Sequence, residues 1–142
     1  MRVLRYGFVE DSGGAGRYRG GLGLRRAIAP VGHTCVFSGA GERFRREPWG
    51  IFGGASGKSG RFFRQAADGD ETPLDTKPNN VAVAPGESVV VESPGAGGYG
   101  PPADRSADAL DADRRSGKFS RSYLQGHYGS AAGQAADTKE EE

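Results

Sequence analysis

The sequence is poor in the residues that build a self-sufficient hydrophobic core. Leu, Ile, Val and Phe together make up about 17% of its 142 residues, below the roughly 20% expected of such a core. The net charge is only +1, so the composition does not match that of a disordered chain either. We therefore expect a folded chain whose core is completed by contact with another protein.

Cysteine and long apolar runs are also scarce. The single cysteine, Cys35, cannot form an intramolecular disulfide, which fits a reducing compartment. No stretch of about 18 apolar residues is present, which excludes a transmembrane helix. The N-terminal residues lack the apolar segment of a signal peptide. We predict a cytoplasmic protein without a membrane partner.

The residues that carry most enzyme chemistry are few. His33 and His127 are the only histidines, and with one cysteine they cannot complete a Cys/His zinc site. The sequence also lacks a Ser/His/Asp order and an H-E-x-x-H motif. We predict no metal site and identify no catalytic residue, so the isolated chain is expected to be inactive.

The first half of the chain is rich in positive charge, and the second half is rich in negative charge. Residues 1–64 contain 12 Lys and Arg against 4 Asp and Glu, whereas residues 65–142 contain 7 against 14. One interpretation is an independent nucleic-acid-binding module that uses the basic half. We favour charge pairing within the chain or between subunits, because an equally acidic half accompanies the basic one. We accordingly predict no nucleic-acid partner.

Glycine is the residue in excess, with 25 copies beside 8 prolines. No Gly-X-Y period is present, which excludes a collagen-like chain. The glycine-rich stretch 53–59 looks like a phosphate-binding P-loop, but it is one residue too short and no helix is expected after it.

A second glycine-rich stretch, 95–100, matches the G-x-G-x-x-G pattern and follows a predicted strand. Pro101 and Pro102 follow at once, and they prevent the helix that a dinucleotide-binding fold requires. We interpret the stretch as a tight glycine turn. Its members are Gly95, Gly97, Gly98, Tyr99 and Gly100.

Short strands are expected before short helices. The patterns predict strands over 3–9, 24–28, 34–37, 61–64, 80–84 and 88–92. The last two are expected to form a hairpin around Pro85-Gly86-Glu87, with the apolar run 88–92 buried on both faces. In the first strand, alternation is expected to place Val3, Arg5, Gly7 and Val9 on one face.

The C-terminal part has helical signals. A helix is predicted over 106–116 with Gly117 as its C-cap, and a second one from an N-cap at Ser120 to about Gln125. The fold class is therefore mainly β with long glycine-rich loops and one or two short C-terminal helices (α+β). We expect one domain over residues 1–129 and a polar, flexible tail over 130–142.

The stretch 11–23 is the best candidate for a binding loop. Glycine amides can form an anion nest, and Arg17 and Arg19 are spaced to point to one side in an extended chain. Two interpretations are equally compatible with this pattern. The loop either lies at a site for phosphate or carboxylate, or it is a rigid loop packed under a neighbouring subunit. The candidate residues are Asp11, Ser12, Gly13, Gly14, Gly16, Arg17, Arg19, Gly20 and Gly21.

These motifs together resemble a known family. DSGGAGRYRGGLGL at 11–24 resembles a signature of the hydantoinase B / 5-oxoprolinase family, which includes large subunits of acetone and acetophenone carboxylases. The chain departs from the family pattern at Gly100-Pro101-Pro102, which lacks an acidic residue, and at Gly86-Glu87 in place of Gly-Asp. Further motifs follow in the family order at 41–43, 48–54, Lys77, 85–91, 94–100, 111–120 and 128–129.

The resemblance implies a function within a larger assembly. Family members carry several hundred residues before this signature, so it implies a small subunit of about 15 kDa, like that of acetophenone carboxylase. Such a complex joins a ketone and bicarbonate to a β-keto acid with ATP, and relatives instead open cyclic amides with ATP. The implied partners are larger hydantoinase A-like and B-like subunits in an obligate hetero-oligomer. The implied cofactors are ATP and Mg or Mn at the level of the complex, with none bound by this chain.

Overall fold

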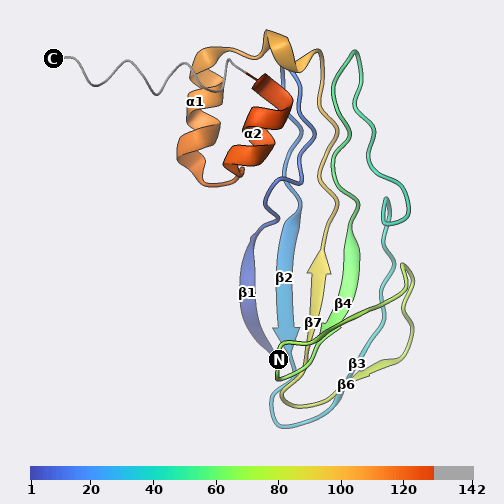
Figure 1. Cartoon of the computed structure of the whole chain (residues 1–142). Coiled ribbons are helices and arrows are strands. Elements are labelled where there is room, and N and C mark those ends of the chain that lie inside the picture. Colours follow the sequence, from blue (N-terminus) through green and yellow to red (C-terminus); the bar gives the residue numbers. More distant parts are fainter. Residues whose placement is uncertain (130–142) are drawn as a thin grey trace, which may run out of the picture.

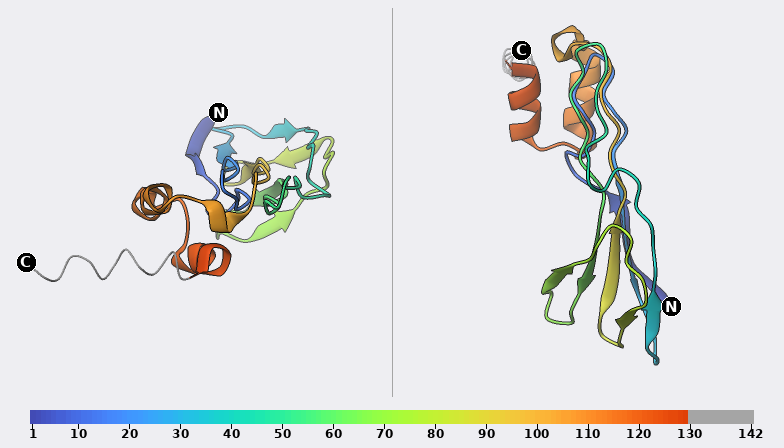
Figure 2. Two further views of the ribbon diagram at one scale, coloured as in Figure 1. Left: turned by 90° about the horizontal axis from the view of Figure 1, so that it is seen from above. Right: turned by 90° about the vertical axis from the view of Figure 1, so that its right-hand side faces the viewer.

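The computed structural model describes residues 1–129, and the predicted tail at 130–142 lies outside the described residues. The described chain is mainly β with two short α-helices near its C-terminal end, which confirms the expected α+β class. A β-sheet occupies one end of the molecule and the helices the other (Figure 1). Extended glycine-rich segments run between the two ends (Figure 2).

The main sheet has five antiparallel strands in the order β1-β2-β7-β4-β5. β7 occupies the centre, and its valines Val89 and Val90 are buried, as predicted for this apolar run. The sequence patterns did not predict β5. The strands are β1 (Arg2–Phe8), β2 (Leu24–Ala29), β4 (Arg61–Gln65), β5 (Glu71–Pro73) and β7 (Ser88–Glu92).

A second, two-stranded sheet overturns the predicted hairpin. The turn at Gly86 forms, with φ +90° and a hydrogen bond from Glu87 N to Ala84 O at 3.0 Å. However, β6 (Val81–Val83) pairs with β3 (Cys35–Phe37), whereas β7 pairs with β2 and β4. The reason is burial, because the centre of the five-stranded sheet buries the apolar side chains of β7, which a two-stranded hairpin with β6 would leave exposed. Local turn chemistry reversed the chain but did not choose the partner strands.

A β-bulge changes which residues of β1 share a face. The register pairs Val3 with Ile28 and Arg5 with Ala27, so Leu4 is an extra residue. Arg5 therefore shares a face with Arg2 and Gly7, while Val3 shares the other with Tyr6 and Phe8. The prediction that Val3 and Arg5 lie on one face was wrong for this reason.

Ion pairs join the basic and acidic halves, which confirms charge pairing within the chain. Glu92 accepts hydrogen bonds from Arg25 at 2.9 Å and from Arg61 at 2.5 Å. Glu71 lies 3.7 Å from both arginines. The hydrogen bond to Glu92 is the main cause that raises the pKa of Arg61 above its ordinary value. The group covers Phe63, whose ring lies under both guanidinium groups.

Three glycine-rich segments, 12–23, 48–60 and 93–100, pack side by side, and we call them the glycine layer (Figure 2). Backbone hydrogen bonds join them, for example from Gly14 N to Ala96 O at 2.8 Å and from Ala55 N to Ala15 O at 2.7 Å. A Cβ atom at Gly20 would lie 1.9 Å from the Ala96 carbonyl oxygen. The close approach of these backbones therefore requires glycine.

The glycines that the packing requires occur in all three segments of the layer. A Cβ atom would come within 3.0 Å of a backbone atom of another segment at Gly14, Gly54, Gly57, Gly97 and Gly98, among others. The glycine-rich loops are therefore ordered segments whose backbones pack directly against one another.

The two helices form as their caps predict. α1 (Ala107–Ser116) begins after Ser106, which accepts a hydrogen bond from Ala109 N, and ends at Gly117 with φ +65°. α2 (Arg121–Tyr128) begins after Ser120 and runs three residues further than expected. Its last residue, Tyr128, is buried with Leu124 in the helical core, which explains the longer helix. A short 3₁₀ helix, η1 (Pro102–Asp104), precedes α1.

Candidate functional site

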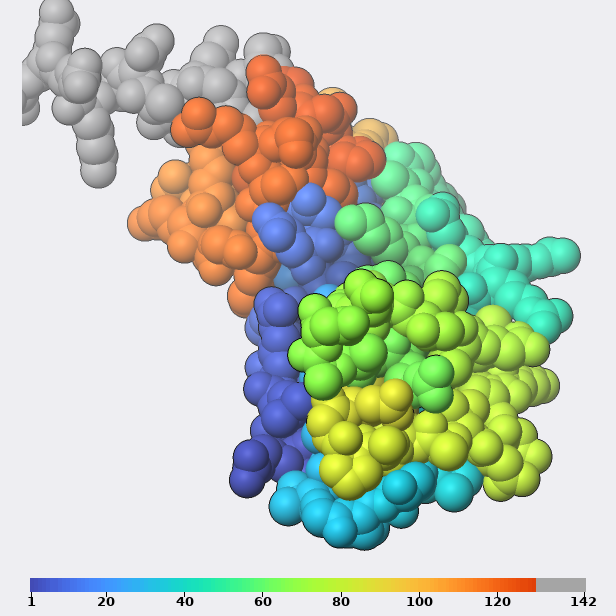
Figure 3. Space-filling view, turned by 60° about the horizontal axis from the view of Figure 1, so that its bottom comes forward, coloured from blue at the N-terminus to red at the C-terminus, as the bar shows by residue number. Residues whose placement is uncertain are grey.

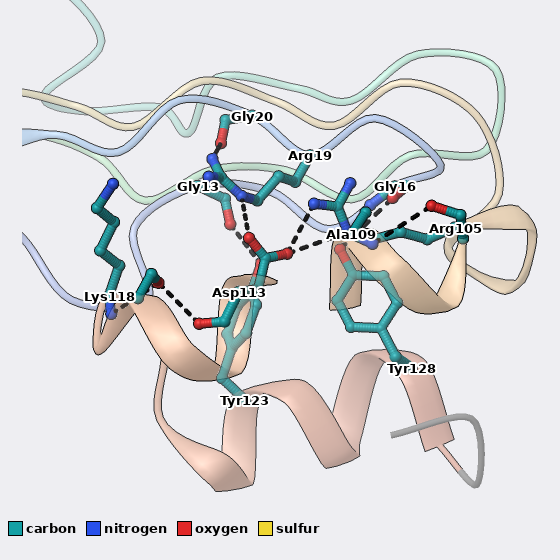
Figure 4. A network of polar contacts seen from close by, with 12 residues as sticks. Gly13, Gly16, Arg19, Gly20, Arg105, Ala109, Asp113, Lys118, Tyr123 and Tyr128 are labelled. Carbon is teal, nitrogen blue, oxygen red and sulfur yellow. Dashed lines mark hydrogen bonds and ion pairs between the residues drawn. The ribbon is translucent and has the colours of Figure 1, made fainter. Parts of the chain in front are cut away.

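A buried carboxylate joins the helices to the glycine layer (Figure 4). Asp113 of α1 is 3% exposed and accepts a hydrogen bond from Arg19 Nε at 2.8 Å. Its other oxygen accepts from Arg105 Nε at 3.0 Å and Nη2 at 2.7 Å. Arg105 also donates to the Arg17 carbonyl oxygen at 3.1 Å. Arg19 therefore holds a helix against the layer, and its charge is already compensated.

Two tyrosines of α2 hold the same loop (Figure 4). The Tyr123 hydroxyl donates to the Gly13 carbonyl oxygen, and the Tyr128 hydroxyl accepts from Gly16 N at 3.2 Å. Burial raises the pKa of Tyr123 well above its ordinary value, and burial likewise raises the pKa of Tyr128. Both phenols are thus neutral hydrogen-bonding groups that fix the loop.

Asp11 and Ser12 also have partners within the chain. The Asp11 carboxylate accepts from Ser120 N at 2.7 Å and from Ser120 Oγ at 2.6 Å. Ser12 is buried, donates to Val9 O at 2.6 Å and accepts from Gly23 N at 2.8 Å. Asp11 therefore supports the start of α2, and Ser12 closes the base of the loop.

These contacts show that most of the candidate residues pack within the chain itself, and packing under a neighbouring subunit stays a prediction. The amides of Gly14, Gly16 and Gly20 donate to Ala96 O, Tyr128 Oη and Gly14 O, so they do not face an anion. The carbonyl oxygens of Gly13 and Gly21 accept bonds from Tyr123 and from Ala96 N. Arg17 differs, because it is exposed and its guanidinium group lies 5.4 Å from the Tyr18 ring centre. An anion site at the loop stays a prediction, with Arg17 as its exposed cation.

The predicted glycine turn is part of the layer and ends in an exposed aromatic cluster. Gly95, Gly97 and Gly98 lie against backbone atoms of the other two segments, and Gly100 has φ +72°. Tyr99 forms bridges with Tyr18 and Ile51. Its ring also contacts Phe52 at 5.2 Å between ring centres. The members, Tyr18, Ile51, Phe52 and Tyr99, are 46–74% exposed.

A polar pocket lies between the layer and α2. Its volume is about 420 Å³, and it is lined by Asp11, Glu47, Ser56, Gly57, Lys58, Ser120, Ser122, Tyr123 and His127. Lys58 is exposed, and its Nζ atom donates to Glu10 O at 3.4 Å. The charged residues of the lining are Asp11, Glu47 and Lys58, because the two hydrogen bonds from Ser120 leave the charge of the Asp11 carboxylate uncompensated. The pocket can therefore bind a small polar group with both a donor and an acceptor.

Sequence reasoning did not identify this pocket. Lys58 was noticed only within a rejected P-loop motif, and His127 only as a possible metal ligand. No local signal brings Glu47 and His127 together, because Glu47 precedes the second segment of the layer and His127 lies on α2, 80 residues further along the chain. Within residues 1–129, no group of three or more His, Cys, Asp or Glu is placed to hold a metal ion. The same residues contain no helix long and apolar enough to cross a membrane.

Several known proteins are similar to this chain in sequence. The chain is 37% identical over 123 residues to caprolactamase subunit beta of Pseudomonas jessenii, covering 83% of this chain and 21% of that one. It is 38% identical to an uncharacterised protein of Methanocaldococcus jannaschii, with 84% and 21% covered. It is also 38% identical to 5-oxoprolinase 1 of Arabidopsis thaliana, with 68% and 7% covered. The chain thus spans about a fifth or less of these relatives.

Two solved structures are similar to this chain in fold. The ATP-dependent caprolactamase from Pseudomonas jessenii matches with a TM-score of 0.67 and 32% identity, covering 89% of this chain and 22% of that one. Nucleotide-free acetone carboxylase shares the fold, with a TM-score of 0.64, 21% identity, and 89% and 21% covered. The sequence model of the Hydantoinase B/oxoprolinase family matches residues 1–102. The chain therefore belongs to the hydantoinase B/oxoprolinase family, as its glycine-rich motifs indicated.

Proposed function

We propose that this chain is the glycine-layer component of an ATP-dependent enzyme complex that opens cyclic amides. The observation that carries the proposal is the match to caprolactamase in both sequence and structure, at 37% and 32% identity. The similarity to 5-oxoprolinases, at 31–38% identity, points to the same class of substrate. Lactams, hydantoins and 5-oxoproline share the cyclic amide that such an enzyme hydrolyses.

ATP-dependent carboxylation is the second candidate. The order of the glycine-rich motifs also resembles that of the acetone and acetophenone carboxylases. In that case the complex would join a ketone and bicarbonate into a β-keto acid. The identity to acetone carboxylase is 21%, so that structure supports the fold and not the reaction. We therefore place cyclic-amide hydrolysis first.

We infer that this chain supports the complex structurally and contributes the residues on one side of a binding pocket. The layer is held by backbone hydrogen bonds and by the Asp113 network, so it is a rigid surface. Lys58 and Glu47 lie at a pocket on that surface. Larger hydantoinase A-like and B-like partners in the cytoplasm would bind ATP and a divalent metal (Mg or Mn). These partners would also supply the catalytic residues. The match covers about a fifth of these relatives, so most of their residues have no counterpart in this sequence.

The test is reconstitution with the larger subunits encoded in the same genome. The tagged chain is co-expressed with them, and ATP hydrolysis by the purified complex is measured with caprolactam, hydantoin and 5-oxoproline. We expect ATP turnover that requires a cyclic amide and does not require bicarbonate. ATP turnover that requires bicarbonate and acetone or acetophenone would replace hydrolysis with carboxylation. A chain that purifies as a monomer without the larger subunits would overturn both.

A further inference from the structure

The two edges of the main sheet differ in how they are protected. β5 is three residues long, contains Pro73, and is tied to neighbouring strands through Glu71. Short, polar and proline-containing strands resist pairing with another chain. β1 is seven residues long, and none of its residues is buried. Its outer side carries no strand among the described residues, so the backbone groups that follow the bulge at Leu4 are free for pairing.

One face of β1 carries exposed apolar side chains, and two of its rings lie against cationic groups of neighbouring elements. Val3, Tyr6 and Phe8 share this face, and they are 59%, 58% and 53% exposed. Leu4, at the bulge, is 56% exposed. Figure 3 shows the N-terminal strand in dark blue along an outer margin of the molecule. A stretch of this length and exposure on an edge strand is a surface that another chain would cover.

The other face of β1 is positively charged. The bulge places Arg2 and Arg5 on one face, opposite Ala29 and Ala27 of β2. Both arginines are exposed, and no ion pair within residues 1–129 involves either of them. On the same face of the sheet, Arg25 and Arg61 are both paired with Glu92. Arg2 and Arg5 are therefore cations without counter-charges at a free strand edge.

From the free edge, the apolar face and the two arginines we infer that β1 accepts an additional strand from a partner polypeptide. That strand carries apolar residues on the side of Val3 and Tyr6 and carboxylates on the side of Arg2 and Arg5. Backbone hydrogen bonds to β1 supply the attachment, and the alternation of acidic and apolar residues supplies the specificity. The sheet thereby gains a sixth strand.

A second copy of this chain fits the edge poorly. Pairing of β1 with β1 would bring the arginines of both copies to one face of the shared sheet. Like charges on facing positions destabilise a strand pair. The charge of the edge therefore selects an acidic strand of a different chain. This inference concerns the surface alone and holds for either proposed reaction.

The test uses synthetic peptides and the 142-residue chain. The probe is the capped peptide Thr-Val-Glu-Val-Glu-Val-Thr, and its control has lysine in place of both glutamates. Binding is followed by ¹H–¹⁵N NMR. We expect the Glu peptide to shift the amide signals of Arg2–Phe8 and not those of Glu71–Pro73, and to bind at least tenfold more tightly than the Lys peptide.

A charge-reversed variant provides a second measurement. R2E/R5E should prefer the Lys peptide, whereas R45E/R46E, at exposed arginines in another loop, should behave as the parent chain. Equal affinity for both peptides, or no change in the amide signals of β1, would overturn the inference. A dimer detected by light scattering, with β1 at its interface in the NMR spectra, would overturn it as well. If R2E/R5E does not fold, the comparison of the two peptides on the unaltered chain decides alone. These outcomes are independent of whether the enzyme complex can be reconstituted.

Discussion

Arg19 and Asp113 lie 94 residues apart in the sequence, and Arg19 Nε donates to the Asp113 carboxylate at 2.8 Å. The contact joins the signature loop of the family to the first helix. The same carboxylate also accepts from Arg105. One buried charge thus fixes the position of the helices on the glycine layer.

Replacing Asp113 should destabilise the chain strongly. D113A leaves Arg19 and Arg105 without their counter-charge, and losing one partner of a buried pair costs about 3 kcal/mol. The free energy of unfolding, measured by urea denaturation, should fall by this amount. D111A is the control, because the Asp111 side chain is 45% exposed and forms an ion pair with the exposed Arg115, so it should lose at most about 0.5 kcal/mol. Equal losses in both variants would contradict the central role of Asp113.

The two candidate arginines of the loop should behave differently. R19A removes one hydrogen bond to Asp113, so we expect a loss of about 1–2 kcal/mol in the free energy of unfolding. R17A removes an exposed side chain that lies over an exposed ring, so the loss should stay below about 0.5 kcal/mol. Urea denaturation of both variants checks this. If R17A destabilises as much as R19A, the assignment of Arg19 as the structural member is wrong.

Neighbouring glycines should differ sharply in their tolerance of a methyl group. At Gly20 a Cβ atom would lie 1.9 Å from Ala96 O, whereas at Gly21 nothing lies within 4 Å. G20A should therefore lose about 3 kcal/mol or fail to fold, because the layer cannot widen locally. G21A should stay within about 0.5 kcal/mol of the parent. Thermal unfolding of the two variants tests the close packing, and similar melting temperatures would refute it.

Local signals in the sequence predicted much of this fold. The strands near 24–29 and 61–65 and the caps at Ser106, Gly117 and Ser120 follow from patterns within a few residues. The pairing of strands that are distant in the sequence was not predictable in this way. The turn at Gly86 was identified, but its two strands pair elsewhere because β7 is buried at the sheet centre.

The site was predicted less well than the fold. Glycine density marked the three segments of the layer, but the contacts between them depend on backbone geometry that single-residue preferences do not encode. The buried network needed Arg19, Arg105 and Asp113 to be brought together across two loops and a helix. In the sequence, Arg19 is a candidate anion-binding residue and Arg105 and Asp113 look like ordinary surface charges, so only the folded structure shows that the three are paired.

Alkaline pH should weaken the attachment of α2. Burial raises the pKa of Tyr123, so the folded chain keeps this proton above pH 10, where an exposed tyrosine loses it. The contribution of Tyr123 to stability is therefore complete below about pH 10 and is lost as the pH rises towards its folded-state pKa. Between pH 8 and pH 11, the free energy of unfolding should fall less for Y123F than for the parent. Y99F, at an exposed tyrosine, controls for the loss of one phenol. An equal fall in Y123F and the parent would contradict the burial effect.

Phe52 should be dispensable for the stability of the chain. It has φ +49°, which is strained for any residue except glycine, and its side chain is 74% exposed. F52G relieves this strain, of order 1 kcal/mol, and loses an edge contact with Tyr99 of about the same size, so unfolding should change by less than about 1 kcal/mol. F52A is the control, because it loses the ring but keeps the strained backbone, and it should be about 1 kcal/mol less stable than F52G. Calorimetry of the three chains measures both differences. If F52G unfolds far more easily than F52A, the backbone strain is not present. The expected result would mean that the exposed ring is not needed for this chain to fold.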